Sequence, residues 1–475
     1  MQKINCRMLT VFITLFFLLS AAVSAAGSEI EFKEALLKAT AENTDLNEKM
    51  LQIENIKRDL KIIRARQSWK AGISAEYDEV LKEGESDAKN AVRFNDTYAE
   101  DGFYSLNIEK NFRSGLILKP EFIYTGDGRE TYRLSLDYPL FPRTPTELEK
   151  NYFITSRELI QAEQEYKEIK NKKIIEWISR YLELLRLEKN KNNLEKSLTK
   201  AVDNLETVKK EADLNEAGEE ELLAAKIAFL TAENDFQQAE NKLQNSRENL
   251  EIELGIKNKD SLILSNDEII YKYFSEIENM EKLPFADLFK EAVVQDAEIK
   301  NYVLDMEILE KELEWKKKED NFSISLNGIY DHQSEESIIG LTADYELFDG
   351  GENKLGQSQI KSKIELAEKK LADLNKEKRI EIKEKLSNIK YAKNNFAKEK
   401  LALQKSKLEL NNAGENFADG LINSSEMISF EISFYNKLNL KQQAEDELLL
   451  ARLNLRQILN KEIIVFDEWR KINDR

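Results

Sequence analysis

The chain has 475 residues, enough for several domains, and its 89 acidic and 71 basic side chains give a formal net charge of −18. A surface with this negative charge repels nucleic acid and anionic lipid headgroups, so we expect neither as a partner. The only cysteine, Cys6, lies in the segment 1–26 that is predicted below to be removed as a signal peptide, so the mature chain would have no disulfide, no thiol catalysis and no thiolate metal site. The single histidine, His332, has no second histidine with which to form a metal site. We therefore expect no cofactor, no metal and no catalytic residue, and the chain is not predicted to be an enzyme.

Residues 1–26 have the pattern of a secretory signal peptide. Lys3 and Arg7 precede an apolar run from Leu9 to Ala26 that ends in small residues. The alternative is an uncleaved membrane anchor. Beyond this segment no run of about 20 apolar residues occurs, so no further membrane-spanning helix is predicted.

The chain then alternates between helical and strand patterns. Residues 31–66 repeat apolar side chains every three or four positions, which predicts one helix. The period changes to two over 71–80, as expected for a strand, and a polar stretch, 82–101, is predicted to be a loop. Alternating runs at 104–112 and 116–124 predict two more strands, and Pro120 in the second indicates an edge or a bulge.

A strand-to-helix block occurs twice. The first copy ends a strand at Leu140 and Phe141, and the second ends one at Leu347 and Phe348. Each is followed at once by a helix start: Thr144-Pro145-Thr146-Glu147 has the spacing of a capping box, and Asp349-Gly350-Gly351-Glu352 repeats it. The two blocks predict strands over 132–141 and 339–348, and a partner strand is predicted over 322–330.

Each block leads into a long helical hairpin. From Thr146 to about Leu214 the chain has no glycine, and a helix of that length, about 100 Å, is typical of coiled coils. We expect Gly218 to break it and the returning helix to end at Leu254-Gly255. The second hairpin is predicted over 352–459, with its break at Gly414 to Gly420.

These patterns indicate an internal duplication. Matching residues lie 253 positions apart before the strands and 205 apart in the returning helices, so the first half carries additional strand-like residues. The predicted division is as follows: signal 1–26, first repeat 27–258 with strands over 71–141 and a hairpin over 146–254, linker 259–284, second repeat 285–460 with strands over 322–348 and a hairpin over 352–459, and tail 461–475.

The order of elements resembles the TolC family of outer-membrane efflux proteins. The resemblance is carried by Leu347-Phe348-Asp349-Gly350-Gly351 at the second junction, by Gly420-Leu421 at the second helical turn, and by the duplication. It implies a mainly α fold with a smaller β part, and a homotrimer whose helices form a tube and whose strands share one outer-membrane β-barrel. The extra hairpin suggests six strands per chain, where the family usually has four; alternatively, 82–130 forms an extracellular loop.

The resemblance also implies roles for the two helical turns. They would form the periplasmic tip that docks a membrane-fusion adaptor, with Gly218, Gly420 and Leu421 as tip residues. The first turn matches less well, being three residues shorter, and a plain helix-breaking turn explains both glycines without a partner. Glu426 occupies the place of an acidic pore constriction in some family members; the alternative is an ordinary solvated glutamate.

The function implied is a passive exit duct in the outer membrane, extending into the periplasm. It would serve a tripartite efflux or type I secretion system together with an inner-membrane pump of RND or ABC type, because no nucleotide-binding loop occurs in this chain. The alternative from another class is an exported coiled-coil protein, structural or adhesive, without a pore.

Overall fold

The structure is a computed structural model, and it describes residues 29–76, 103–125, 128, 130–256, 261–264, 280–319, 322–332 and 335–464. The predicted signal peptide 1–26 and the predicted loop 82–101 lie outside the described residues, as do most of the 259–284 linker and of the 461–475 tail. Nearly all the predicted helices and strands lie inside them.

The chain folds into two compact units. One contains the chain up to Met50 together with Glu165–Ala297 and the part from Asn375 onward; the other consists of Leu51–Gln164 and Glu298–Leu374. Each unit draws on both halves of the sequence. The sequence repeats and the compact units are therefore different divisions of the same chain.

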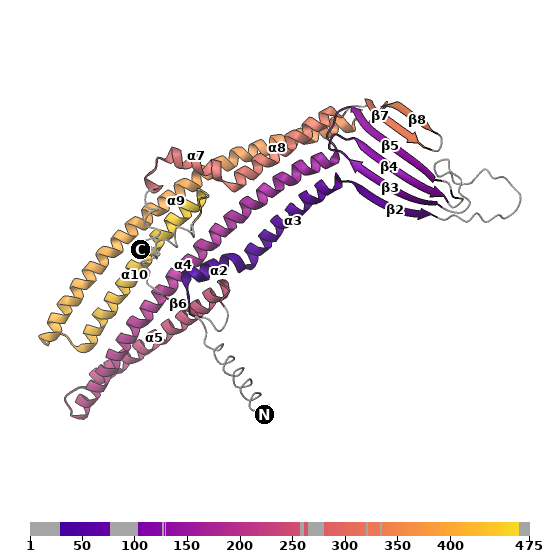
Figure 1. Ribbon diagram of the computed structural model, residues 1–475. Helices are drawn as coiled ribbons and strands as arrows, with labels where there is room; N and C mark the ends of the chain where they lie inside the picture. The colour runs from indigo at the N-terminus through magenta and orange to yellow at the C-terminus, as the bar shows by residue number, and fades with distance from the viewer. Residues whose placement is uncertain are drawn as a thin grey trace, which may run out of the picture. The chain divides into compact units, whose positions relative to one another are not determined.

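Eight described helices account for most of the residues (Figure 1). In chain order they are α2 (Phe32–Glu42), α3 (Thr44–Arg66), α4 (Glu147–Asp213), α5 (Glu219–Glu253), α7 (Phe285–Gln295), α8 (Ala297–Lys318), α9 (Glu352–Ala418) and α10 (Ser424–Ile458). They fall into pairs of matching length: α2 and α7 have 11 residues, α4 and α9 have 67, and α5 and α10 have 35.

The single helix predicted over 31–66 is wrong, because the chain breaks at Asn43. This residue is extended (φ −61°, ψ 130°), and its side-chain oxygen accepts the backbone N–H of Leu46 at 3.2 Å, which caps α3. Asp296, 253 positions later, has nearly the same backbone angles (φ −61°, ψ 128°) between α7 and α8. An Asn or Asp side chain competes with the helix for local N–H groups, and the bond from the Leu46 N–H to Asn43 shows this competition at the first break.

The second long helix continues through Gly414, which was predicted to begin its break. A glycine inside a helix costs about 1 kcal/mol relative to alanine. Helix α9 nevertheless continues through Gly414 to Ala418. The break comes at Gly420, whose φ is +71°.

The first unit has its core where the helices pack around a two-stranded ladder. The strands β1 (Glu29–Glu31) and β6 (Ser261–Ile263) pair in parallel. Beside them the rings of Phe32 in α2 and Tyr181 in α4 stack with centroids 3.9 Å apart, and both side chains are buried. In α5 three alanines spaced seven residues apart are buried: Ala225, Ala232 and Ala239. Their small size allows the neighbouring backbones to approach closely.

The second unit contains one antiparallel sheet of six strands, side by side in Figure 1. The strands are β2 (Lys70–Glu76), β3 (Phe103–Asn111), β4 (Ile117–Thr125), β5 (Glu130–Phe141), β7 (Phe322–Asp331) and β8 (Glu336–Tyr345), in the order β2-β3-β4-β5-β7-β8. Six strands is the number that the extra hairpin suggested. The halves of the sequence meet where β5 pairs with β7.

Two details of the predicted strands are wrong. Pro120 marks neither an edge nor a bulge: β4 is an inner strand that keeps its register with β3, and their pairing is interrupted between Asn107↔Glu121 and Lys110↔Leu118. Proline has no N–H to donate, so a ladder bond is missing there without a shift. The strand predicted over 339–348 ends at Tyr345, where its pairing with Phe322 at the start of β7 ends.

Candidate functional site

The sheet has one apolar face. Although Ile117, Ile123, Ile329 and Ile338 point the other way, register places most apolar side chains of the six strands on this face, because alternate residues point to opposite faces. Its middle includes Ile73, Leu106, Leu136 and Leu341. Aromatic residues occupy both ends of this face: Tyr104, Phe122, Tyr124, Tyr132 and Tyr330 at the end away from the helices, and Phe112, Tyr138, Phe141, Phe322 and Tyr345 at the helix end.

The opposite face carries most of the polar residues. Arg133 of β5 lies on this face toward the end of the sheet away from the helices, with one guanidinium nitrogen 3.4 Å from an Asp331 carboxylate oxygen and another 4.0 Å from Glu121. The hydroxyl oxygens of Ser74 and Ser105 are 2.6 Å apart on the β2–β3 pair. The described sheet is thus amphipathic, with hydrogen-bonded and ion-paired groups on one side only.

The first strand-to-helix junction has a capping box, two residues beyond the predicted one. The Thr146 hydroxyl accepts the N–H of Glu149 at 3.2 Å, and the Glu149 carboxylate accepts the N–H of Thr146 at 3.3 Å. The Thr144 N–H is already donated to the Pro142 carbonyl at 2.9 Å, so no glutamate can use it. Helix α4 therefore begins at Glu147.

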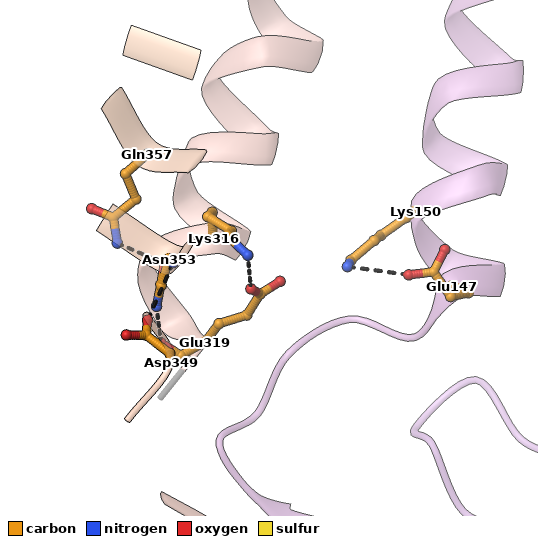
Figure 2. A network of polar contacts seen from close by, with 7 residues as sticks. All are labelled: Glu147, Lys150, Lys316, Glu319, Asp349, Asn353 and Gln357. Carbon is orange, nitrogen blue, oxygen red and sulfur yellow. Dashed lines mark hydrogen bonds and ion pairs between the residues drawn. The ribbon is translucent and has the colours of Figure 1, made fainter. Parts of the chain in front are cut away.

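The second junction is closed by Asp349 (Figure 2). Its carboxylate accepts the N–H of Gly351 at 2.8 Å and that of Asn353 at 3.2 Å. These two backbone hydrogen bonds lower the pKa of the Asp349 carboxyl, and burial opposes the shift weakly. The Asn353 amide in turn donates to the carbonyl of Glu319 beyond the end of α8, at 3.0 Å. Asp349 thus orders the start of α9 beside the end of α8.

The other predicted junction residues fall into two groups. Gly350 and Gly351 have positive φ (+62° and +85°), a conformation that glycine adopts without strain. Leu347 and Phe348 follow β8 and are 88% and 83% exposed, whereas Leu140 and Phe141 lie at the end of β5. Two large, exposed apolar side chains just beyond a strand indicate a surface that is covered in the working protein.

The first helical turn differs from the prediction. Helix α4 ends at Asp213, and the left-handed residue that closes it is Asn215 (φ +59°). The N–H of Glu216 donates to the Glu211 carbonyl at 2.8 Å, which gives a Schellman closure. Gly218 instead stands just before α5 as its N-cap residue.

The second turn has the same closure. Gly420 is the left-handed residue, and the N–H of Leu421 donates to the Asn416 carbonyl at 2.8 Å. Gly420 therefore corresponds to Asn215, at the offset of 205, and Gly218 corresponds to Asn423. Five residues separate the helices in both hairpins (214–218 and 419–423), so the expected three-residue difference in turn length is wrong.

Glu426 takes part in a capping box at the start of α10. Its carboxylate accepts the N–H of Asn423 at 2.9 Å, and its own N–H donates to the Asn423 side-chain oxygen at 2.8 Å. The side chain is exposed, but it bends back toward its own helix. At the first turn Gly218 offers no side chain for a cap. The apolar side chain of Leu421, by contrast, takes no part in a cap and is 72% exposed.

No model of a known protein family matches the chain, and no curated protein matches its sequence. Solved structures match over most of their length. CusC, described for its transmembrane channel formation, superposes with a TM-score of 0.63 at 11% identity over 92% of this chain and 94% of CusC. The Campylobacter jejuni CmeC outer membrane channel gives 0.63 at 14% identity, over 94% of this chain and 89% of CmeC. The outer membrane protein VceC of Vibrio cholerae gives 0.60 at 14% identity, over 91% and 97%.

The chain has the fold of outer-membrane channels. The predicted architecture of long helical hairpins joined to a smaller sheet is thus confirmed. The homotrimer, the helical tube and the shared barrel stay predictions. No helix among the described residues is long and apolar enough to cross a membrane, and no metal-binding group of histidine, cysteine and acidic side chains occurs among those residues.

Sequence reasoning missed Asn215 and Asn423, and a signal for both was present. The constant offset of 205 between the hairpins equates Asn215 with Gly420 and Gly218 with Asn423. The prediction paired glycine with glycine instead. Asparagine tolerates the left-handed conformation and is a favoured N-cap, so both positions could be filled by either residue.

Proposed function

We propose that this protein is an exit channel of the outer membrane. The observation that carries the proposal is the six-stranded sheet: strands β3, β4, β5, β7 and β8 have 9 to 12 residues, the length that crosses a bilayer when tilted. Its apolar face has aromatic residues at both ends, as transmembrane strands have at the two membrane interfaces. The solved structures of similar fold are of outer-membrane channels, which supports the same location here.

The channel is proposed to be a homotrimer. In the described sheet, β2 and β8 each have one edge with no strand partner. Open edges are not viable in lipid, because unpaired backbone groups cost several kcal/mol there. Three chains that pair β8 of one with β2 of the next would close a barrel of about 18 strands, with the apolar face toward lipid and Arg133 toward the pore.

The working end is proposed to be the pair of helical turns. Gly218, Gly420 and Leu421 would dock a periplasmic membrane-fusion adaptor, which in turn connects the duct to an inner-membrane pump of RND or ABC type. The exposed Leu421 supports this role, since a large apolar side chain at a turn is available to a partner. The duct itself would be passive and would serve efflux or type I secretion.

Glu426 is proposed to face the pore near these turns. Three copies would form an acidic ring that favours cations. Glu426 also caps α10, so its charge in the pore and its contribution to stability have to be tested separately. Glu426→Gln does this, because it keeps an acceptor for the Asn423 N–H but removes the charge.

The two repeats, 27–258 and 285–460, are proposed to be copies of one ancestral unit. The equal lengths of α2 and α7, α4 and α9, and α5 and α10 support this. So do the identical breaks at Asn43 and Asp296. The linker 259–284 would join the copies, and 461–475 would form the C-terminal tail.

A test uses two arginine variants on adjacent residues of β5. Leu136 lies on the apolar face and Ser135 on the polar face. An arginine near the middle of a lipid-facing strand costs about 2–4 kcal/mol. We expect Leu136→Arg to reduce sharply the trimer recovered from the outer-membrane fraction, whereas Ser135→Arg assembles and conducts ions in planar bilayers with altered conductance.

The proposal is wrong if the wild-type chain is recovered as a soluble, non-conducting oligomer. That result would favour the exported coiled-coil protein without a pore. The same conclusion would follow if Leu136→Arg and Ser135→Arg were both recovered as soluble protein in equal yield.

A further inference from the structure

A lysine stands at the helix end of the apolar face. Lys110 of β3 pairs with Leu118 of β4, which places its side chain on the side of the apolar residues. Its ammonium nitrogen lies 5.3 Å from the ring centroid of Trp69 and 5.2 Å from that of Phe112. Among the residues that the structure describes, no carboxylate pairs with this ammonium, whereas the nearby Arg113 is paired with Glu149 at 3.2 Å.

An apolar cavity lies next to this lysine on the same face. It has a volume of about 330 Å³ and is lined mainly by apolar-face residues, among them Ile108, Pro120, Phe122 and Leu134. Ile108 precedes Lys110 by two residues, so the cavity begins about 7 Å from the lysine along the strand. It lies where Pro120 interrupts the pairing of β3 and β4.

The position of the cavity keeps it open in the proposed assembly. It is formed by β3, β4, β5 and β7, and the sheet edges that neighbouring chains would use belong to β2 and β8. If the apolar face is turned toward lipid, the occupant comes from the bilayer. A volume of 330 Å³ is too small for a whole lipid and accommodates part of one acyl chain.

We propose that each chain binds one phospholipid of the leaflet nearer the helices, with its phosphate on Lys110 and part of an acyl chain in the cavity under Leu134. The proposal rests on the proposed function, because it needs the apolar face to be in a membrane. Three features of this face match the three regions of a phospholipid. The lysine matches the phosphate, the tryptophan matches the interfacial region, and the apolar cavity matches an acyl chain. The net charge of the whole chain does not oppose this, because it is screened within about 10 Å.

The test measures the phospholipid that the trimer retains. The full chain is inserted into vesicles of phosphatidylethanolamine and phosphatidylglycerol, extracted in a mild detergent, and weighed by native mass spectrometry. We expect up to one retained phospholipid per chain. Lys110→Gln should lower the retained fraction about fivefold, the effect of one basic side chain at a membrane surface.

Control experiments distinguish binding at this site from a general effect of positive charge and from non-specific retention of lipid. Lys119→Gln removes the same charge from the polar face of β4, where Lys119 lies 3.9 Å from Glu109, and should retain as much lipid as wild type. Leu134→Phe fills part of the cavity and should reduce retention while Lys110 is intact. Diacylglycerol, which lacks the phosphate, and glycerol phosphate, which lacks the chains, should both be retained poorly.

The outcomes distinguish this inference from the function on which it rests. A conducting trimer whose lipid content is the same in wild type and in Lys110→Gln overturns the lipid site alone. An equal loss in Lys119→Gln also overturns it. A chain that neither inserts nor forms a trimer overturns the proposed function and the lipid site together.

Discussion

The ion pair between Lys378 and Asp296 gives the sharpest test of how the helices are held. The Lys378 ammonium on α9 lies 2.5 Å from Asp296 at the α7–α8 break and 2.7 Å from Glu381; the side chains of Lys378 and Asp296 are only 17% and 10% exposed. Burial lowers the pKa of Lys378, but the hydrogen bonds to Asp296 and Glu381 outweigh it and raise the pKa overall. Lys378→Met removes one partner and leaves a carboxylate with little water around it.

The expected cost follows from that burial. Removing one member of a fully buried ion pair costs about 3–5 kcal/mol. Some water reaches both groups here, so we expect about 3 kcal/mol, close to a hundredfold in the unfolding equilibrium. The duplication supplies a matched control: Lys173, 205 positions earlier, lies 2.8 Å from Asp45, whose side chain is 60% exposed. Lys173→Met should therefore cost only about 0.2–1 kcal/mol.

A second variant tests the cause. Asp296→Asn places at the α7–α8 break the residue type that Asn43 provides at the α2–α3 break. In the double variant with Lys378→Met the buried carboxylate is removed together with the ammonium that faces it, so most of the lost stability should return. The assay is urea unfolding of the detergent-solubilised protein at pH 8, followed by circular dichroism.

The dependence on pH has a definite sign. Because the folded pKa of Lys378 lies above the ordinary value of 10.5, its contribution is complete below pH 10.5 and is lost as the pH rises through the folded value. Equal costs for Lys378→Met and Lys173→Met would refute the reasoning. So would a double variant as unstable as Lys378→Met alone.

Three further predictions concern turns and caps. Asn423→Ala should destabilise α10 by about 1 kcal/mol and speed amide exchange in its first turn. Gly218→Asn should slow exchange at the start of α5, because a Cβ at Gly218 meets no atom within 4 Å and asparagine is a favoured N-cap. Unchanged exchange in both variants would contradict the capping assignment. Gly115→Ala should cost about 1–2 kcal/mol in chemical unfolding, because its φ is +86° and a Cβ would lie 2.9 Å from Pro139 Cγ; a neutral effect would disprove this packing. Asp349→Ala should destabilise the protein above pH 4 but less as the pH falls through the lowered folded pKa of Asp349, and a constant difference across an acid titration would refute that.

The long helices and the amphipathic strands could be predicted because their signals are repeated over many residues. Residues 147–213 contain neither glycine nor proline, and apolar and polar residues alternate from Leu134 to Tyr138, so one residue that departs from the pattern does not change the predicted helix or strand. The boundaries depend on single hydrogen bonds. Thr144 and Thr146 each precede a glutamate by three residues, and only the Thr144 N–H bond to Pro142 decides between them.

The errors at the turns and in the sheet have different causes. At the first turn the prediction looked for a glycine, whereas Asn215 adopts the left-handed conformation there. In the sheet, Pro120 was expected at an edge because a proline breaks a ladder, yet strand order depends on pairing between distant segments. No local pattern around Pro120 reveals that β4 has neighbours on both sides.

The β5–β7 ladder has a consequence for how the protein is made. Arg133 and Asp331 are paired there, although 198 positions separate them in the chain. During synthesis the first four strands emerge long before β7, so β5 has an unpaired edge on the growing chain that can pair with a wrong strand. Because β5 and β7 pair late, we expect the growing chain to need a chaperone that covers its first strands until β7 is made.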